Sequence, residues 1–385
     1  MIGQKGIPTR FGGIERHVEE LSRRLGAMGH EVIVYTRAWY AAPKERFSPG
    51  VRTVAAPTIN TKHLDAIVHT FTATLAALRS GVDVIHYHGV GPSLLAWIPR
   101  LLSPRTKVVA TFHCIDRKHQ KWNIVARTML GLGEWAACAF PHETITVSKT
   151  LEAYCRDRFN REPHYIPNGI AKPMAVRSDS ALDRFGLKKN GYVAMVSRLV
   201  RHKGAHYLIE AFNDLSRRHL TRGLKLVFVG DSAFTDDYVA EVKKLAEGNP
   251  DIVFTGYQQG AALRQLFAGA YAVIHPSESE GLPIAVLEAM SYGKAVLASD
   301  IPEIMEVTRE HGLNFKNKSV ADLTRKLRHL IAHPELAKAK GRAARNFVLA
   351  NYHWNDVAES VDELYASFDR PDLGKARVKV ATAKN

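Results

Sequence analysis

The sequence predicts an α/β protein built from two doubly wound Rossmann-like domains, and three observations support this. At 385 residues the chain is too long for one ordinary domain and suits two of about 170 residues each. Short, almost continuously apolar runs alternate with helical patterns, which is typical of a parallel sheet covered on both faces. A polar stretch without strand signals, residues 171–190, separates two such series, so we expect one domain over 1–168 and another over 169–353.

The first domain opens with a loop where a strand is expected. Ile2 is all that remains of the apolar run before Gly3, so the first strand is either short or begins upstream of Met1. Gly12 and Gly13 precede a helical pattern, and they either cap that helix or let a ligand approach the backbone. The apolar patterns predict strands at 32–36, 83–88, 107–113 and 144–148 and helices at 14–28 and 62–79.

Histidines gather at the carboxyl ends of these strands, which is where doubly wound sheets bind ligands. His86 and His88 end one predicted strand, and His113 ends the next. A single histidine is usually structural, but several at one edge of a sheet favour a site. Asp116 and the pair Lys121–Trp122 follow, and they are candidates for lining the same cleft.

The second domain repeats the alternation of strands and helices. Its patterns predict strands at 192–197, 225–230, 252–256, 271–276 and 294–300 and helices at 320–332 and 334–351. The loop after the first of these strands carries Arg198 and Lys203 just before Gly204. An arginine grips a phosphate bidentately and a lysine adds a point charge, although an exposed basic turn is the alternative.

The stretch from His275 to Asp300 carries the strongest sign of chemistry. A loop rich in Ser, Glu and Gly follows a buried strand there. A helix is predicted to begin near Leu282, with Pro283 in its first turn, and to end at Gly293. The free N–H groups at the start of such a helix bind anions.

Two carboxylates frame this helix start. Glu280 precedes the helix and Glu288 lies within it, with seven residues between them, which is about 12 Å along a helix axis at 1.5 Å per residue. That spacing suits one carboxylate at each end of a sugar diphosphate whose phosphates are bound by the helix N-terminus. A solvated surface helix with a capping glutamate is the alternative for the pair taken alone.

These segments together resemble the family 4 retaining glycosyltransferases, which are enzymes of the GT-B fold. Glu280 and Glu288 match the Glu-x7-Glu signature of that family. Residues 12–15 resemble its N-terminal glycine loop, 111–113 its acceptor-side histidine strand, 166–169 its crossing between domains, and 197–204 its diphosphate-binding loop. The matches keep the order of the family over nearly all of residues 3–369, and Cys114 departs from the glycine expected after the histidine.

The resemblance implies a cleft between the two domains, a helix over 354–369 that returns to the first domain, and a role for each matched residue. It implies that His113 approaches the transferred sugar and that Glu280 contacts the donor sugar. The implied phosphate contacts of the donor nucleotide are Gly13, Arg198, Lys203 and the amides of Gly281, Leu282 and Ile284. Pro283 is a further donor-binding residue, Glu288 binds the ribose, and the backbone near Tyr257 meets the base. The nucleoside-diphosphate sugar is then a co-substrate, and no metal or other cofactor is expected. No Asp-x-Asp pair occurs.

The chain is basic, since 53 Lys and Arg face 38 Asp and Glu for a net charge of +15. Because no nucleic-acid-binding motif accompanies this charge, we expect a nucleotide sugar and an anionic membrane surface as partners rather than nucleic acid. Residues that suit such a surface are Trp97, Arg100, Arg105, Lys107, Arg117, Lys118 and Lys121. Residues 370–385 carry five basic residues and one acidic residue and are predicted to be a disordered basic tail.

The compartment follows from what the sequence lacks. No apolar run is long enough for a membrane span, and no secretory signal is recognisable. Cys114, Cys138 and Cys155 lack metal-binding spacing and are expected to be reduced thiols. We therefore expect a cytoplasmic enzyme, either peripheral on the inner face of the plasma membrane or freely soluble.

The resemblance and the residues together predict a metal-independent retaining glycosyltransferase of the hexosyltransferase type. It moves a sugar from a nucleoside-diphosphate sugar to a hydroxyl of a glycan or lipid-linked acceptor in cell-surface polysaccharide or glycolipid synthesis. Two alternatives remain: a nucleotide-sugar 2-epimerase of the same fold, which consumes the donor without an acceptor, and a non-catalytic nucleotide-sugar binder. A dinucleotide oxidoreductase is disfavoured because no Gly-x-Gly-x-x-Gly follows a strand.

Overall fold

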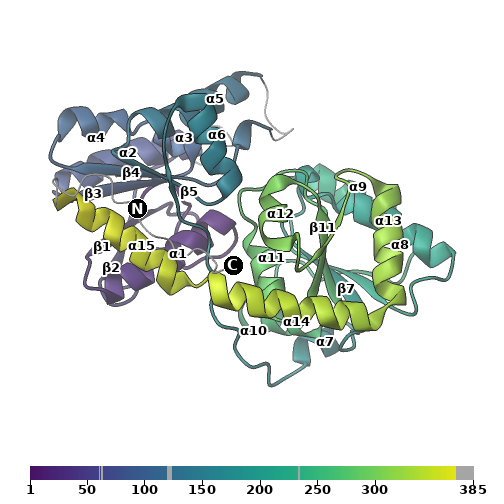
Figure 1. Ribbon diagram of the computed structural model, residues 1–385. Helices are drawn as coiled ribbons and strands as arrows, with labels where there is room; N and C mark the ends of the chain where they lie inside the picture. The colour runs from purple at the N-terminus through teal and green to yellow at the C-terminus, as the bar shows by residue number, and fades with distance from the viewer. Residues whose placement is uncertain (60, 62–63, 119–123, 233–234, 370–385) are drawn as a thin grey trace. The chain divides into compact units, whose positions relative to one another are not determined.

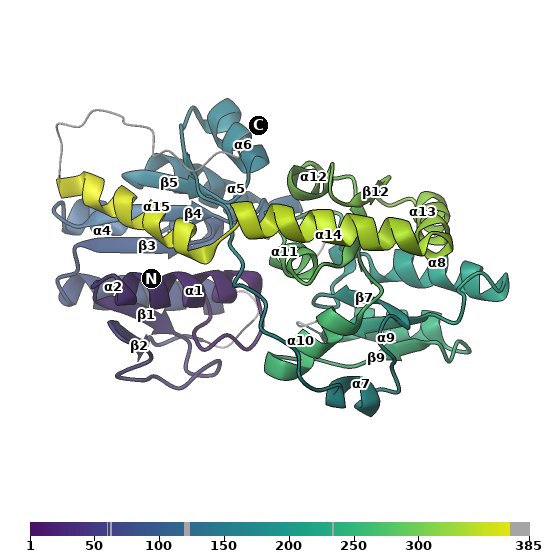
Figure 2. The same cartoon turned by 60° about the horizontal axis from the view of Figure 1, so that its bottom comes forward.

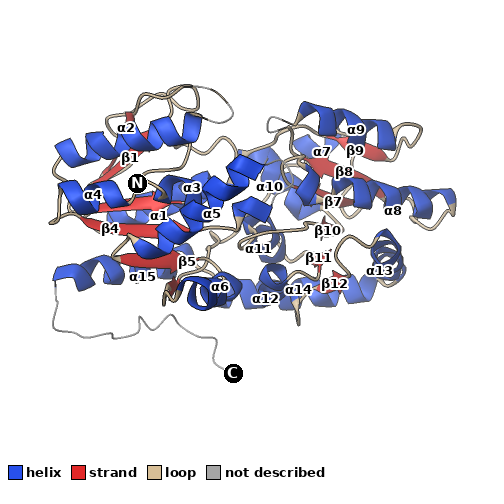
Figure 3. Ribbon diagram, turned by 90° about the horizontal axis from the view of Figure 1, so that it is seen from above, coloured by secondary structure: helices blue, strands red, loops and turns tan. Residues whose placement is uncertain are grey.

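The computed structural model describes residues 1–59, 61, 64–118, 124–232 and 235–369. The chain divides into two compact units, the first made of Met1–Gly169 with Trp354–Asn385 and the second of Ile170–His353. In each unit parallel strands lie between helices (Figure 3). The predicted fold class, two Rossmann-like α/β domains with parallel sheets, is confirmed. Among the described residues, none of the helices is both long and apolar enough to span a bilayer.

In the first unit, Met1 and Ile2 connect two groups of parallel strands. One group is β1 (Val32–Thr36) with β2 (Val51–Ala55), and the other runs β3 (Val84–His88), β4 (Lys107–Phe112), β5 (Glu143–Thr146) and β6 (His164–Tyr165). Met1 bonds to β1 through its amino group and its carbonyl oxygen, at 2.9 and 3.1 Å. Ile2 forms a parallel bridge with Tyr87 of β3. These two residues are the short first strand, and the strand order reverses beside them.

Helices cover both faces of this sheet (Figure 1). They are α1 (Gly13–Ala27), α2 (Asp65–Arg79), α3 (Val90–Ser93), α4 (Trp97–Leu102), α5 (Ile124–Ala139), α6 (Lys149–Phe159) and α15 (Trp354–Ala366), with short 3-10 turns η1 (Asp116–Lys118) and η3 (Ser367–Asp369). Figure 2 shows α15 running beside α1 and β3. Its Tyr365 hydroxyl is 2.6 Å from Nδ1 of His86, and its Asp362 carboxylate is 2.6 Å from Nε2 of His30. The C-terminal helix therefore packs on the first unit.

The sheet of the second unit is parallel, with the strand order β12-β11-β10-β7-β8-β9. Its strands are β7 (Tyr192–Val196), β8 (Lys225–Val229), β9 (Ile252–Phe254), β10 (Ala272–His275), β11 (Ala295–Ser299) and β12 (Leu313–Phe315). The order reverses between β7 and β10, which are neighbours in space and distant in the chain. Doubly wound sheets bind ligands in the crevice at such a point, beyond the carboxyl ends of the strands.

The helices of the second unit pack on this sheet and bury its core. They are α7 (Ser180–Arg184), α8 (Ala205–Arg217), α9 (Asp236–Ala246), α10 (Gly260–Gly269), α11 (Ile284–Ser291), α12 (Pro302–Thr308), α13 (Val320–Ala332) and α14 (Pro334–Asn351), with the 3-10 turn η2 (Arg201–Lys203). Phe212 of α8, Phe228 of β8 and Leu297 of β11 are fully buried in one core. Burial of each such side chain stabilises the unit by about 1.5–3 kcal/mol. The core holds the loops that follow β7 and β10 in place.

Candidate functional site

Two loops meet at the point of the second unit where the strand order reverses. One follows β7 and contains η2, and the other runs over residues 276–283 after β10. The amide of Glu278 donates to the carbonyl of His202 at 2.7 Å. Gly204 has φ +74°, and a Cβ added there would lie 2.1 Å from the carbonyl oxygen of Pro276. Only glycine permits this close approach, so the basic loop and the glutamate loop predicted from the sequence are brought together.

The contact between the loops centres on a buried ion pair. Nζ of Lys203 lies 2.5 Å from Oε1 of Glu280, and Nε2 of His275 lies 2.7 Å from the same oxygen. The Lys203 side chain is 14% exposed and the Glu280 side chain is 9% exposed. Burial alone would raise the pKa of Glu280, but the Lys203 ammonium and the His275 hydrogen bond outweigh burial and hold that pKa well below its ordinary value. Glu280 is therefore an ionised carboxylate held in one position.

Arg198 is the second cation at this edge of the sheet. It follows Ser197, the first residue after β7, and is half-buried. Within the described part of the chain its guanidinium makes no hydrogen bond or ion pair, whereas Arg201 in the same loop pairs with Glu241. A guanidinium without a protein anion at the ligand edge of a sheet suits an anionic ligand.

The helix that follows, α11, begins later than the sequence predicts. Pro283 is its N-cap, with extended backbone at φ −74° and ψ 109°, and Ile284 is its first residue. The carbonyl of Pro283 accepts from the amides of Val286 and Leu287. The amides of Ile284 and Ala285 have no acceptor among the described residues, so they are available at the helix N-terminus.

The two carboxylates lie as the sequence predicts relative to this helix. Glu288 lies in α11 and is half-buried, and Glu280 belongs to the preceding loop. Because residues 281–283 are not helical, the helical rise alone does not set the separation of the two carboxylates. Gly281, Leu282 and Pro283 are buried.

Tyr257 lies at the same edge of the sheet, beyond β9. It follows Gly256, which has φ +67° and whose carbonyl accepts from the amide of Gly230 at 3.0 Å. Its side chain is 42% exposed. Tyr257 therefore belongs to the carboxyl edge of the sheet but lies two strands from β7.

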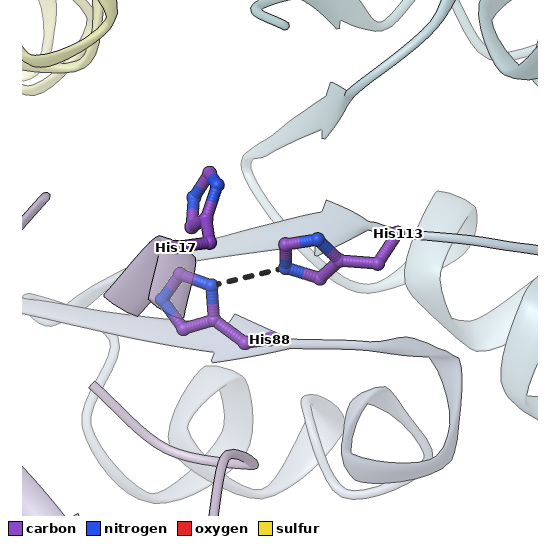
Figure 4. Close-up of side chains that lie close together, drawn as sticks. All are labelled: His17, His88 and His113. Atoms are coloured by element: carbon purple, nitrogen blue, oxygen red, sulfur yellow. Dashed lines mark hydrogen bonds between the residues drawn. The ribbon is translucent and has the colours of Figure 1, made fainter. Parts of the chain in front are cut away.

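In the first unit, three buried histidines converge where its strand order reverses (Figure 4). His88 ends β3, His113 follows β4, and His17 comes from α1. Nδ1 of His88 is 3.4 Å from Nε2 of His113, and the His17 and His113 rings are 4.8 Å apart between centroids. One ring nitrogen from each of the three lies within 4.8 Å of the others. The sequence reasoning missed His17, although it lies one helical turn after Gly13 at the ligand edge.

His86 is adjacent to this cluster but has a structural role. Its ring stacks on His88 with centroids 4.2 Å apart, and its nitrogens bond to Thr111 and Tyr365. Burial lowers the pKa of His86, His88 and His113 well below the usual value and lowers that of His17 to about 4. The four rings are therefore neutral at pH 7.

The two glycines at the start of α1 differ in what a side chain would meet there. Gly12 is the N-cap at φ +113°, and a Cβ there would lie 1.8 Å from Oε2 of Glu15. A Cβ on Gly13 would meet nothing within 4 Å. The cap explanation therefore applies to Gly12, and Gly13 borders open space that a ligand can approach.

The remaining first-unit candidates lie after His113. Asp116 accepts a hydrogen bond from the Cys114 thiol at 3.2 Å. Its neighbour Arg117 pairs at 2.9 Å with Glu134. Lys121–Trp122 and the tail over 370–385 lie outside the described residues.

Comparisons with known proteins cover most of the chain. A family model described as Glycosyltransferase Family 4 matches residues 11–171, and one described as Glycosyl transferases group 1 matches residues 181–347. The glycogen synthase of Mycobacterium tuberculosis is 26% identical, over 96% of this chain and 94% of that protein. The GDP-mannose-dependent alpha-(1-6)-phosphatidylinositol monomannoside mannosyltransferase of the same species is 24% identical, over 94% of this chain and 97% of that protein.

A solved structure extends the similarity to the whole fold. HepE (Alr3699) of Anabaena, crystallised with UDP and glucose, superposes with a TM-score of 0.76. The two proteins are 19% identical, and the superposition covers 94% of this chain and 98% of HepE. At this identity the likeness shows a shared GT-B fold.

Proposed function

The chain belongs to glycosyltransferase family 4, and from that premise we propose that it transfers a hexose-type sugar from a nucleoside-diphosphate sugar to a hydroxyl of a glycan or lipid-linked acceptor. The observation that carries the proposal is the meeting of the two loops of the second unit. The loops bring Arg198, Lys203, Glu280 and the N-terminus of α11 to the carboxyl edge of the sheet where its strand order reverses, and doubly wound sheets bind ligands at such a point.

In this proposal the donor diphosphate binds to two cations and the free amides of α11. Arg198 supplies a bidentate guanidinium, and Lys203 supplies an ammonium that Glu280 already orients. The amides of Ile284 and Ala285, with the helix dipole behind them, favour a phosphate oxygen. Lys203 then bridges the phosphate and Glu280.

The other donor contacts are assigned by position in the fold. The ionised Glu280 accepts hydrogen bonds from hydroxyls of the donor sugar. Glu288 binds the ribose hydroxyls, and the backbone near Tyr257 meets the base. Among the similar proteins, one carries GDP-mannose in its name and another was crystallised with UDP, so both bases enter the test below.

The transfer itself needs charge stabilisation more than a protein base. The bond between the anomeric carbon and the diphosphate breaks, the acceptor oxygen bonds to that carbon on the same face, and the leaving phosphate oxygen takes the acceptor proton. Arg198, Lys203 and the α11 amides stabilise the charge that develops on the diphosphate, the work that a metal ion does in other enzymes. His113 is neutral because burial lowers its pKa, so it acts on the sugar as a hydrogen-bonding group.

The acceptor side of the proposal includes a membrane surface. The exposed face of α5 carries five large apolar side chains, Ile124, Val125, Met129, Leu132 and Trp135, of which Ile124 is 79% exposed. Arg127 lies on the same helix, and the whole chain has a charge of +15. An apolar helix face beside a basic residue binds anionic bilayers, with about 1 kcal/mol per basic residue near the surface.

This membrane contact would bring the enzyme to the surface that holds a lipid-linked acceptor. A role in polysaccharide or glycolipid synthesis at the cytoplasmic face of the plasma membrane follows from that contact, and it forms part of the proposal.

An acceptor-dependence assay separates this function from its alternatives. Purified protein is incubated with UDP- and GDP-sugars, with and without a lipid extract or glycan fraction, and released nucleoside diphosphate is measured. A transferase releases diphosphate faster when the acceptor is present and yields a glycosylated product. Equal release without any acceptor, with a free sugar epimer as product, would indicate the epimerase. The absence of release in a protein that binds the donor would indicate a binder.

A further inference from the structure

The histidine cluster has more nitrogen donors than the proposed transfer uses. Only His113 has a role there, yet His17 and His88 turn a ring nitrogen toward it (Figure 4). All three side chains are buried, and they come from α1, the end of β3 and the residue after β4. Three buried imidazoles from separate elements, meeting at the ligand edge of a sheet, are unlike a packed histidine that bonds to its own surroundings.

The spacing of these nitrogens is that of a tetrahedral metal site. A zinc–imidazole bond is about 2.0–2.1 Å long, so two ligand nitrogens of a tetrahedral ion lie about 3.3–3.4 Å apart. Nδ1 of His88 and Nε2 of His113 are 3.4 Å apart. Without a metal ion the same two nitrogens form a long hydrogen bond, drawn as the dashed line in Figure 4. The third nitrogen lies within 4.8 Å of the others, so a modest rotation of His17 completes three ligand positions.

The partners of the ring nitrogens of His17 and His88 that point away from the cluster also suit metal-binding histidines. Nδ1 of His17 is 2.9 Å from the side-chain oxygen of Asn168, which accepts only from a protonated nitrogen. Nε2 of His17 is then unprotonated. Nε2 of His88 is 3.2 Å from the sulfur of Met1, which leaves the lone pair on Nδ1, the nitrogen nearest His113. Such partners on the far nitrogen fix the tautomer and orient ligating histidines.

We propose that His17, His88 and His113 form a binding site for a divalent transition-metal ion of the zinc class. Neutral imidazoles suit Zn²⁺, Co²⁺, Ni²⁺ or Cu²⁺, and not Mg²⁺ or Ca²⁺, which prefer oxygen. Three protein ligands leave one coordination position open.

The site has a consequence that rests on the proposed function. A metal ion bound to Nε2 of His113 removes that nitrogen from hydrogen bonding with a sugar. The ion therefore inhibits transfer. Its ligands belong to the first unit, and the proposed diphosphate ligands belong to the second.

Cobalt titration of the full chain tests the site directly. Four-coordinate Co²⁺ gives strong visible absorption, so metal-free protein is titrated with Co²⁺ and the spectrum recorded. We expect one ion per chain and displacement by Zn²⁺. His17→Gln and His88→Gln should each remove the absorption, and Asn168→Ala should weaken Co²⁺ binding by about 10–100-fold through the lost outer contact.

A matched control lies on α13 and the residue after it, where the rings of His329 and His333 are 4.3 Å apart and one helical turn separates them. His329→Gln should leave the cobalt spectrum unchanged. Loss of the spectrum in His329→Gln with retention in His88→Gln would put the ion on this surface pair and overturn the proposal, as would no visible absorption at all. Circular dichroism of each variant shows that it is folded.

An inhibition assay then separates the site from the proposed function. Micromolar Zn²⁺ should slow transfer by the parent protein and have less effect on His88→Gln. Cobalt binding without any transferase activity would support the site and contradict the function. Transfer that Zn²⁺ leaves unchanged in protein with one bound ion would overturn the inhibitory consequence.

Discussion

Replacing Lys203 by methionine tests whether the two loops of the second unit are held together by a buried ion pair. The substitution keeps the approximate length of the side chain and removes its charge. Lys203 is 14% exposed and its Nζ lies 2.5 Å from Oε1 of Glu280, so the variant leaves a buried carboxylate beside His275 without its ammonium partner. Breaking a buried pair from one side costs about 3–5 kcal/mol, and we expect a loss of that size in the free energy of unfolding at pH 7. Lys203 is therefore not the fold-neutral surface cation that an exposed basic turn would supply.

The loss in the free energy of unfolding should depend on pH. In the parent protein the pKa of Glu280 lies well below its ordinary value, because the Lys203 ammonium and the His275 hydrogen bond outweigh burial. The stability from that carboxylate is present above the unfolded pKa of about 4.3 and is lost as pH falls through the lower folded pKa. In Lys203→Met burial dominates and the folded pKa rises, so protonation relieves the buried charge and the deficit shrinks as pH falls toward about 4.5.

Urea unfolding followed by far-ultraviolet circular dichroism measures the deficit at pH 7 and at about pH 4.5. All five tryptophans belong to the first unit, so tryptophan fluorescence in the same samples reports on that unit alone. Lys203→Met/Glu280→Gln removes both charges and should recover most of the loss, with a coupling of about 2 kcal/mol or more. Arg201→Ala, which breaks an exposed pair with Glu241, should cost less than about 1 kcal/mol. A deficit under about 1 kcal/mol at pH 7, or one of equal size at both pH values, would refute the reasoning.

Three further predictions concern the site, the loop and the membrane. Glu288→Gln should mainly raise the KM for the donor, because the ribose is bound in both ground and transition states, while Glu280→Gln should mainly lower kcat; identical KM-only defects in steady-state kinetics would contradict this division. Gly204→Ala should lower the free energy of unfolding by at least about 2 kcal/mol, since its Cβ would lie 2.1 Å from the Pro276 oxygen, whereas Gly223→Ala, with open space at its Cβ, should cost less in the same urea titration. Ile124→Ser/Val125→Ser should weaken co-sedimentation with anionic vesicles at least tenfold, and binding of the parent protein should fall with added salt; equal binding to neutral vesicles would argue against the α5 surface.

Sequence patterns indicated the strands that are continuously apolar and missed the ones that are not. The apolar run of β7 has no counterpart in β2 (Val51–Ala55), where Arg52 and Thr53 interrupt it, or in β12 (Leu313–Phe315), which has a polar residue at its centre. The start of α11 was placed too early because a proline fits both the N-cap and the first turn, and its extended ψ of 109° is set by the surrounding loop.

The candidate site was predictable as a set of loops but not as a set of contacts. Loop positions after strands, with the family resemblance, placed Arg198, Lys203 and Glu280 at one edge of a sheet. No sequence pattern indicates that Lys203 pairs with Glu280, because 77 residues separate them and β10 must lie beside β7 for the loops to touch. His17 was missed for a similar reason. A histidine on an amphipathic helix becomes a candidate site residue only when the fold shows that it lies beside His88 and His113.

The most direct test of the account is calorimetric titration of UDP and GDP into the parent protein, Arg198→Ala and Arg201→Ala. Arg198 has no protein anion among the described residues, so its removal should leave the unfolding midpoint nearly unchanged and weaken binding of the preferred diphosphate by about 1.5–3 kcal/mol, as expected for a charge-assisted hydrogen bond. Arg201 lies in the same loop as Arg198 and is paired with Glu241 of α9, so its replacement should cause no loss of affinity. Equal affinity in the parent protein and both variants would remove the loop after β7 from the donor site and contradict the account.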